Sequence, residues 1–260
     1  MQHLDWDNEL AAVWRPKSAR LRVVRRFDTV QLEDLLGIDA QKQALVANTE
    51  LFLAGKLANN ALLWGSRGTG KSSLIKALLN RYGASGLRVV EIDKDDLVDL
   101  PEIVDGLREL PQRFIVFCDD LSFEEGESSY KHLKSILEGS IELPPENILI
   151  YATSNRRHLI PERMSENRDV KLVDGELHYS DTIEEKLSLA DRFGLWLSFY
   201  PASQEQYLKM VDAFFPTCPD RERLHRLALQ FAQTRASRSG RTARQFYLSM
   251  QGVAGLTPDG

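Results

Sequence analysis

Gly65-Ser66-Arg67-Gly68-Thr69-Gly70-Lys71-Ser72 follows directly after the apolar run Ala61-Leu62-Leu63-Trp64 and precedes an amphipathic segment. It has the form G-x-x-x-x-G-K-[ST], in the required order of strand, loop and helix. The three glycines let successive backbone N–H groups point at one phosphate, and the N-terminus of the next helix adds partial positive charge. We expect Lys71 to reach the β and γ phosphates and Ser72 to coordinate Mg²⁺. The alternative is a glycine-rich turn with a purely structural role.

Short apolar runs alternate with longer amphipathic segments on both sides of this motif. The runs begin at Ala61, Leu87, Phe114, Asn147 and Leu195. Nearly continuous runs of β-branched and aromatic residues are typical of strands buried on both faces. The segments between them have helical periodicity. This alternation predicts an α/β fold with a mainly parallel sheet.

The composition excludes several classes of protein. The chain has 260 residues, of which 43% are hydrophobic and 27% charged, so it is neither disordered nor collagen-like. Its net charge of −5 differs from the strongly basic balance of dedicated nucleic-acid binders. The two cysteines, Cys118 and Cys218, can form neither a disulfide framework nor a zinc site. With no signal-like start and no apolar run of about 20 residues, we expect a cytoplasmic protein without a membrane partner.

The two flanks differ from this alternating core. Residues 1–34 contain a basic stretch and are interpreted as an extension or a linker running along the sheet; a helix is expected at 38–54. The core is assigned to residues 35–201, within which residues 156–179 predict a surface loop or a short hairpin. Only helical patterns follow, separated by prolines, so residues 202–260 predict a small all-helical domain.

Two acids follow the third predicted strand. The apolar residues Ile115 to Cys118 lead into Asp119 and Asp120, which places both carboxylates at the edge of the sheet beside the phosphate loop. There Asp119 can hold Mg²⁺ and Asp120 can orient or deprotonate an attacking water. Glu124 and Glu125 are rival bases, with a solvated acidic loop as their alternative role.

An amide follows the fourth predicted strand. Ala152-Thr153-Ser154-Asn155 ends this strand, so Asn155 emerges at the same edge as the acidic pair. Its side chain can hold the water between Asp120 and the γ-phosphate. The alternative is a turn or helix cap before Arg156.

The motifs together resemble those of AAA+ ATPases over residues 35–250. The stretches GSRGTGKS, IVFCDD, YATSN, LADRFG and SGRTARQF carry this resemblance. More narrowly, NNALLWGSRGTGKSS, FIVFCDDLSFE, YATSNRRHL and LADRFGLWLSF resemble an uncharacterised bacterial AAA+ family. The paired aspartates are also similar to the replication-initiator and helicase-loader branch. The resemblance implies a P-loop NTPase fold with a five-stranded sheet of order 5-1-4-3-2 and a small C-terminal helical lid.

The resemblance also implies a role for individual residues toward ATP and Mg²⁺. Leu35, Leu36 and Gly37 would lie near the adenine. Gly65 to Ser72 would be the Walker A motif, with Ser73 also at the nucleotide, and Asp119 and Asp120 the Walker B motif. Asn155 would be sensor 1, Arg192 the arginine finger, and Arg241 or Arg244 sensor 2 in the lid.

The arginines have simpler alternatives. An arginine inserted from a neighbouring subunit neutralises charge developing on the γ-phosphate, an effect of ~10³ to 10⁵ in rate. Arg192 would otherwise form a surface salt bridge with Asp191 or Glu185. Arg241 and Arg244 would otherwise lie on a solvated helix face.

The chain departs from common AAA+ patterns in three places. Asp120 stands where many members have a glutamate, which indicates slow or partner-stimulated turnover. Residues 93–97 are acidic where polypeptide-threading motors have an aromatic loop, which disfavours an unfoldase. The 260 residues contain no helix-turn-helix or zinc pattern, so we do not expect an initiator's duplex-reading domain among them. Nucleic-acid surfaces would be limited to the basic stretch 15–26, the pair Arg156-Arg157 and the arginines of 221–244, each of which has a solvated or nucleotide-facing role as its alternative.

These observations predict an oligomeric, ATP-dependent ring or open assembly that hydrolyses ATP to ADP between its subunits. Hydrolysis would change the angle between the core and the helical lid. This movement would act on an unidentified protein or nucleic-acid client. Two alternatives are a helicase-loader-like nucleotide switch with little turnover and a monomeric P-loop phosphotransferase. The helical tail with SGRTARQF favours the first interpretation over the phosphotransferase.

Overall fold

A seven-stranded sheet forms the centre of the computed structural model, which describes residues 4–121, 133, 136, 137, 143–155, 171–173, 176–178 and 192–251. Its order is β2-β1-β4-β5-β6-β3-β9, and every neighbouring pair is parallel except β1 with β2. The strands are β1 (Ala11–Arg15), β2 (Arg20–Val23), β3 (Ala61–Gly65), β4 (Leu87–Ile92), β5 (Arg113–Cys118), β6 (Ile148–Ser154) and β9 (Leu195–Phe199). The predicted α/β fold with a mainly parallel sheet is therefore confirmed.

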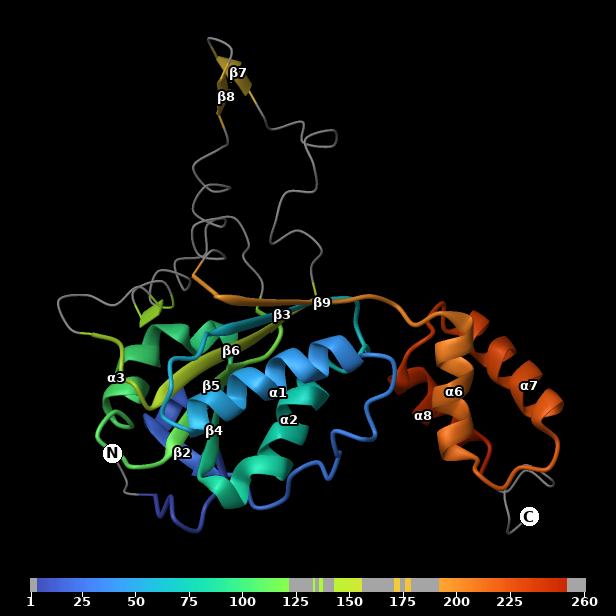
Figure 1. Cartoon of the computed structure of the whole chain (residues 1–260), viewed down its shortest axis with the longest axis horizontal. Helices are drawn as coiled ribbons and strands as arrows, with labels where there is room; N and C mark the ends of the chain where they lie inside the picture. Colours follow the sequence, from blue (N-terminus) through green and yellow to red (C-terminus); the bar gives the residue numbers. More distant parts are fainter. Residues whose placement is uncertain are drawn as a thin grey trace.

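Helices cover both faces of this sheet, and three more helices form a separate group (Figure 1). Among the described residues, the helices of the α/β part include α1 (Asp39–Leu53), α2 (Lys71–Tyr82) and α3 (Leu100–Asp105), with 3-10 turns η1 (Pro16–Ser18), η2 (Gly83–Ser85) and η3 (Lys94–Asp99). The C-terminal group consists of α6 (Gln204–Phe214), α7 (Arg221–Thr234) and α8 (Gly240–Ser249). The helix expected at 38–54 is confirmed as α1. Among the described residues, no helix has the length and apolar character needed to cross a membrane.

The expected five-stranded sheet of order 5-1-4-3-2 is wrong in strand number and in overall order. The five expected strands are neighbours in the order β9-β3-β6-β5-β4, but β1 and β2 extend the sheet beyond β4. Residues 11–23 are thus part of the sheet, and the linker interpretation is wrong for them. The sequence of β2 lacks the apolar run that is typical of a buried strand, because only Leu21 is buried and it lies between the exposed Arg20 and Arg22. Such a short, charged strand is typical of a sheet edge.

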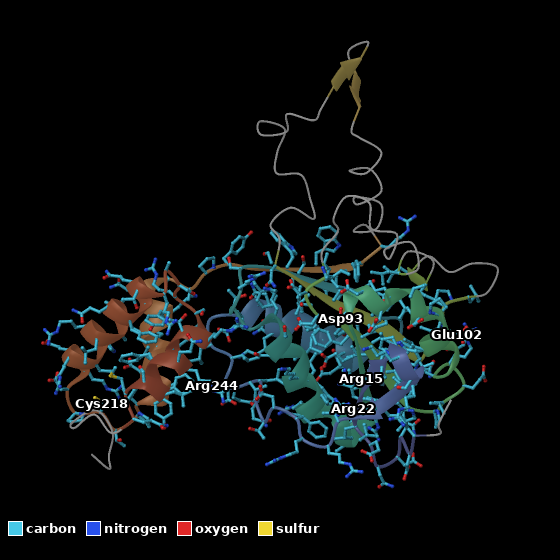
Figure 2. The ribbon with its side chains drawn as sticks, turned by 180° about the vertical axis from the view of Figure 1, so that it is seen from behind. Arg15, Arg22, Asp93, Glu102, Cys218 and Arg244 are labelled. Carbon is cyan, nitrogen blue, oxygen red and sulfur yellow. The ribbon has the colours of Figure 1, made fainter. Side chains whose placement is uncertain are left out.

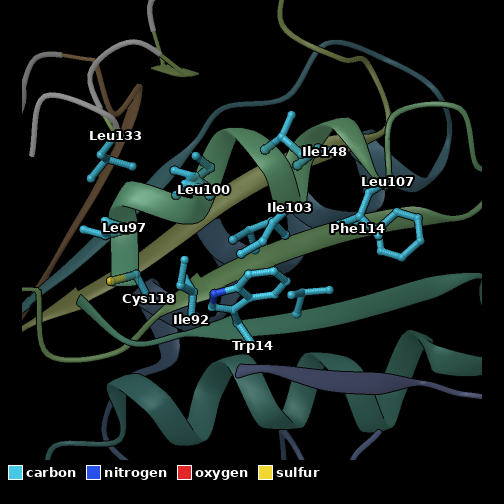
Figure 3. Packing of buried hydrophobic residues seen from close by; sticks show 14 of the residues in the cluster. Trp14, Ile92, Leu97, Leu100, Ile103, Leu107, Phe114, Cys118, Leu133 and Ile148 are labelled. Carbon is cyan, nitrogen blue, oxygen red and sulfur yellow. The ribbon is translucent and has the colours of Figure 1, made fainter. Parts of the chain in front are cut away.

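Two apolar clusters sandwich the sheet because side chains alternate along each strand. On one face, the strand residues pack against η3 and α3, and Figure 3 shows Trp14, Ile92 and Phe114 beside Leu100 and Ile103. The Trp14 indole Nε1 also donates a hydrogen bond to Asp99 Oδ2 at 2.8 Å. The other face packs against α1 and α2. Fully buried side chains of this size each contribute about 1.5–3 kcal/mol, so the sheet is rigidly held from both sides.

The C-terminal helices have an apolar core of their own. It contains Tyr207, Val211, Leu224 and Phe246, and it shares no residue with the two clusters of the sheet. Side-chain oxygens of Ser203, Asp220 and Ser239 cap the N-termini of the three helices. The described residues 202–251 thus have an apolar core of their own. The assignment of residues 202–260 as a small domain, with boundaries at residues 34 and 201, stays a prediction.

Part of the expected loop at 156–179 forms a small ribbon. Strands β7 (Lys171–Val173) and β8 (Glu176–His178) pair antiparallel, apart from the central sheet. The other residues of that segment lie outside the described residues.

Candidate functional site

The phosphate loop connects β3 to α2, and its glycines adopt backbone conformations that other residues rarely reach. Gly65, Gly68 and Gly70 have φ values of 130°, 75° and 99°. A Cβ atom at Gly65 would lie 2.0 Å from the backbone oxygen of Phe199 in β9, so this position requires glycine. The Ser66 N–H donates to the same oxygen at 2.9 Å. The backbone at the start of the loop therefore packs against β9 and is hydrogen-bonded to it.

Lys71 is the first residue of α2 and its ammonium group is enclosed by the loop. Nζ donates to the carbonyl oxygens of Gly65 (2.9 Å) and Ser66 (2.8 Å) and to Asn155 Oδ1 (3.0 Å), and only 5% of the residue is exposed. Burial lowers the pKa of Lys71 to about 8, although the carboxylates of Asp119 and Asp120 oppose this shift. A cation held in this way is poised to exchange its neutral acceptors for phosphate oxygens.

Asp119 lies beside the hydroxyl group of Ser72. Its Oδ1 accepts a hydrogen bond from Ser72 Oγ at 2.7 Å, and Asp119 is exposed at the carboxyl end of β5. The two expected metal ligands are thus brought together from separate elements. Hydroxyl and carboxylate oxygens are the donors that Mg²⁺ prefers, so this pair fits the ion that the fold implies.

Asn155 connects Lys71 to Asp120. Its Oδ1 accepts from Lys71 Nζ at 3.0 Å, while its Nδ2 donates to Asp120 Oδ1 at 2.5 Å. This is the orientation of the amide that satisfies both a cation and a carboxylate. Asp120 has a φ of 55°, in the left-handed region that only a minority of non-glycine residues adopt. Strained backbone at such a position is typical of functional sites.

Thr153 completes the arrangement, and the sequence analysis missed it. Its buried hydroxyl donates to Asp119 Oδ1 at 2.5 Å and accepts from the Asp120 N–H at 3.0 Å. Its backbone oxygen accepts from Leu121 N–H at 2.7 Å. The signal was present, because Thr153 lies two residues before Asn155 at the end of β6, and residues two apart in extended chain project from the same side. One hydroxyl group therefore fixes both aspartates relative to β6.

The segment expected near the adenine lies between the phosphate loop and the helical domain. A Cβ at Gly70 would lie 3.9 Å from Leu35 Cδ2, and a Cβ at Gly37 would lie 3.4 Å from Gln206 Nε2 of α6. The backbone oxygen of Leu35 accepts from Lys42 Nζ at 2.9 Å, and Leu36 between these residues is half-buried. Leu35 is thus next to the phosphate loop, and Gly37 is next to α6 of the helical domain.

The start of α8 also meets the phosphate loop. A Cβ at Gly68 would lie 2.9 Å from Ser239 Oγ and 3.4 Å from the Cβ of Arg241. The charge of Arg241, together with that of Arg67, contributes to the lowered pKa of Lys71, after the larger effect of burial. Arg244, three residues further along α8, is exposed on the side of the helical domain toward the α/β part (Figure 2). Of the two arginines, Arg241 is therefore the one shown beside the phosphate loop.

Arg192 lies away from the phosphate loop of its own chain. It precedes β9, whose residue Leu195 pairs with Ala61 at the start of β3, whereas Phe199 pairs with Gly65. The intervening five residues span about 16 Å at 3.3 Å per residue. The structure therefore does not bring Arg192 together with Lys71. Glu124, Glu125, Glu185 and Asp191 lie outside the described residues.

The chain has an AAA+-like fold, in which a helical domain follows an α/β core that carries a phosphate-loop motif. The chain belongs to the family described as "Protein of unknown function (DUF815)", whose model matches residues 7–254. The expected kinship with an uncharacterised AAA+ family is therefore confirmed.

One solved structure with a TM-score above 0.5 shows the same fold. A structure of the replication initiator DnaA bound to AMPPCP and single-stranded DNA matches with a TM-score of 0.60 and 18% identity, covering 89% of this chain and 67% of that chain. A RuvB P216G mutant from Thermotoga maritima matches with a TM-score of 0.49 and 14% identity, covering 85% and 73%. No curated protein matches the chain significantly.

Proposed function

We propose that the protein is a cytoplasmic, Mg²⁺-dependent ATPase whose active site is completed between subunits of a homo-oligomer. The observation that carries this proposal is the Asn155 amide, which connects the ammonium of Lys71 to the carboxylate of Asp120. A phosphate-binding cation and a candidate base joined by one amide are suited to hydrolysis rather than to binding alone.

The chemistry follows from the positions of these side chains. Lys71 and the backbone N–H groups of the phosphate loop would bind the β and γ phosphates of ATP. Ser72 and Asp119 would hold Mg²⁺, which when bound neutralises charge on the phosphate oxygens. Asp120 would accept the proton of a water that attacks the γ-phosphate, while the bond to the β-phosphate breaks and ADP leaves. Asn155 would orient that water once the γ-phosphate takes its place beside Lys71.

Contacts between the phosphate loop and the helical domain support a mechanical output. Gly68 approaches Ser239 and Arg241 at the start of α8, and Gly37 approaches α6. A nucleotide bound between these elements would change their separation as its γ-phosphate is lost. We infer that the angle between core and helical domain is the quantity that hydrolysis changes, and that a protein or nucleic-acid client follows this movement.

The position of Arg192 supports a shared active site. It lies at the amino end of β9, about the length of a strand away from the phosphate loop. An arginine finger at this position would act on the nucleotide of a neighbouring subunit, as trans-acting arginines do in other P-loop enzymes. The proposal therefore requires an oligomer for full activity.

A nucleotide switch with little turnover is a second candidate, and one observation favours it. The Asp120 carboxylate is one methylene shorter than a glutamate and already engaged by Asn155. If this bond persists after ATP binds, the base stays occupied. The protein would then respond to binding rather than to hydrolysis.

Steady-state ATP hydrolysis per subunit, measured over a hundredfold range of protein concentration with light scattering on the same samples, tests the proposal. We expect specific activity to rise as particles larger than monomers form. Arg192→Ala should assemble and bind ATP normally, yet lose at least a hundredfold in turnover. Arg81→Ala, on an exposed position of α2, is a control that should retain activity. Constant activity of a monomer, or normal turnover of Arg192→Ala in the assembled protein, would contradict the shared site.

A further inference from the structure

The edge of the sheet formed by β1 and β2 carries an unusual concentration of positive charge. We call residues 15–26 the basic hairpin; its cations are Arg15, Lys17, Arg20, Arg22, Arg25 and Arg26. No acidic residue occurs between positions 10 and 27. Because the chain as a whole carries −5 and the hairpin carries +6, the rest of the chain carries −11. The hairpin is thus a local cationic surface on an acidic protein.

The strand register gathers three of these arginines on one face. Arg15 pairs with Arg20, and Val13 pairs with Arg22. Trp14 and Leu21, which alternate with them, are buried in the core on the opposite face of the hairpin. Arg15, Arg20 and Arg22 are all exposed, and Figure 2 shows Arg15 and Arg22 close together on β1 and β2. The arginines therefore form one continuous outer surface.

This arrangement has a cost for the folded protein. Like charges directly opposite each other on antiparallel strands are destabilising, and Arg15 lies directly opposite Arg20. Between the residues that the structure describes, none of the six cations forms an ion pair. Arg15 interacts at longer range with Glu91 and Asp96, which lie on and after β4. Arg20 and Arg22, on the outermost strand, lie one strand further from these acids.

We propose that the basic hairpin binds nucleic acid through its phosphate backbone, independently of base sequence. Five of the six cations are arginines, whose planar guanidinium groups bind phosphate through two parallel hydrogen bonds. Side chains two residues apart on a strand are separated by about 6.8 Å, and phosphates of one DNA strand advance about 3.4 Å each along the helix axis. Arg20 and Arg22 are therefore far enough apart to contact separate phosphates of one strand.

An anionic membrane fits this surface less well. Stable docking on a bilayer needs a second element beside the cations, such as apolar side chains that enter the interface. Among the residues of the hairpin and its immediate neighbours, Phe27 is the large apolar side chain that is exposed, at 38%. A row of arginines with only this one exposed apolar neighbour is better suited to a phosphate backbone.

The proposed surface is separate from the ATPase site. The phosphate loop, Asp119 and Asn155 follow β3, β5 and β6, whereas the hairpin lies beyond β4 at the edge of the sheet. Binding to nucleic acid can therefore be measured without nucleotide, and its outcome does not depend on whether the protein hydrolyses ATP.

The test is fluorescence anisotropy of labelled DNA duplexes of two unrelated sequences, and of one single strand, titrated with the full chain at several salt concentrations. We expect equal affinity for both duplexes and a steep decrease with salt. Arg20→Gln combined with Arg22→Gln should weaken binding at least tenfold and reduce the slope of log K against log salt by about 2, since each phosphate contact contributes about 0.9. Basal ATP hydrolysis should be unchanged.

A matched control removes the same charge elsewhere. Arg223 and Arg226 are exposed on α7, and replacing both with Gln changes the net charge equally. This variant should bind DNA within about threefold of the wild type, because long-range attraction alone is screened beyond about 10 Å.

Several outcomes would overturn the proposal. One is equal loss in the two double variants, and another is a strong preference for one duplex sequence. A third is binding to phosphatidylserine vesicles but to no DNA, which would assign the surface to a membrane. Comparable binding of the duplexes and the single strand would support the proposal, since duplex and single-stranded DNA both present phosphates. A melting temperature at or above that of the wild type shows that the hairpin variant is folded.

Discussion

The centre and the edge of the sheet use charged residues in opposite ways. At the carboxyl ends of β3, β5 and β6, Lys71 has three acceptors and Asp119 has two hydroxyl donors. On β2 at the edge, Arg20 and Arg22 are exposed, and Arg20 lies directly opposite another arginine. Groups that are mutually satisfied form a site with fixed geometry, suited to one small substrate. Groups that repel each other are suited to a large partner that supplies the opposite charge.

The largest expected effect is at the centre. Asp120→Asn should leave ATP affinity unchanged but lower kcat by about 10² to 10⁴, because an amide cannot accept the proton of the attacking water. The measurement is single-turnover hydrolysis beside equilibrium binding of a fluorescent ATP analogue. Asp105→Asn, at the end of α3, is a control that should keep the wild-type rate. A wild-type rate in Asp120→Asn would transfer the role of base to another carboxylate.

Thr153 tests how far the central network depends on one hydroxyl group. Thr153→Val keeps the shape but leaves Asp119 and the Asp120 N–H without this partner, which should lower kcat about tenfold and raise the Mg²⁺ concentration needed for half-maximal activity. Thr153→Ser retains the hydroxyl and should restore both quantities. A loss of stability with an unchanged Mg²⁺ dependence, or failure of the serine variant to restore it, would assign Thr153 a merely structural role.

The charge of Lys71 should make ATP affinity depend on pH. Burial lowers its pKa to about 8, so in the free protein the ammonium loses its proton as pH rises through 8, well below the usual range of lysine. We expect ATP affinity to fall about tenfold between pH 7 and pH 9, since the neutral amine does not attract phosphate. Lys71→Arg should bind more weakly at pH 7 but show no such decrease, because a guanidinium stays protonated. An identical decrease in both proteins would exclude Lys71 as its source.

The smallest expected effect is a change in protein stability at the edge of the sheet. Unlike the substitutions at the centre, this one is expected to be favourable. Arg20→Gln removes one member of the Arg15–Arg20 pair and should stabilise the protein by a few tenths of a kcal/mol at low salt. Chemical denaturation at low and high salt measures it, and the difference should disappear at high salt through screening. Destabilisation by Arg20→Gln at low salt would mean that the arginine makes a favourable contact in the free protein.

The sequence was most informative where local pattern and chemistry coincide. The phosphate loop needs glycines, a lysine and a hydroxyl within eight residues, and the strands around it are short apolar runs, so both were predictable. Asp119, Asp120 and Asn155 followed from one rule, that parallel strands end at a common edge. The structure brings Asp119 and Asn155 within hydrogen-bonding distance of Ser72 and Lys71, and Asp120 within hydrogen-bonding distance of Asn155.

The sequence was least informative where pairing joins distant segments. Strand β1 pairs with β4 across more than seventy residues, and only one residue of β2 is buried, so residues 11–23 have the appearance of a charged linker. The proximity of Arg241 to the phosphate loop depends on how α8 meets Gly68, which no periodicity specifies. The same applies to Thr153, whose hydroxyl acquires its two partners only when β6 lies beside β5.

The sequence by itself determined the α/β class, the phosphate loop and the residues that gather around it, because these depend on contacts between near neighbours and on the direction of parallel strands. The tertiary structure decided the two additional strands, the network around Thr153 and the separation of Arg192 from its own phosphate loop. It also decided that three arginines share one face at the sheet edge. Each of these depends on register between segments far apart in the chain, and register is set by the packing of the whole core.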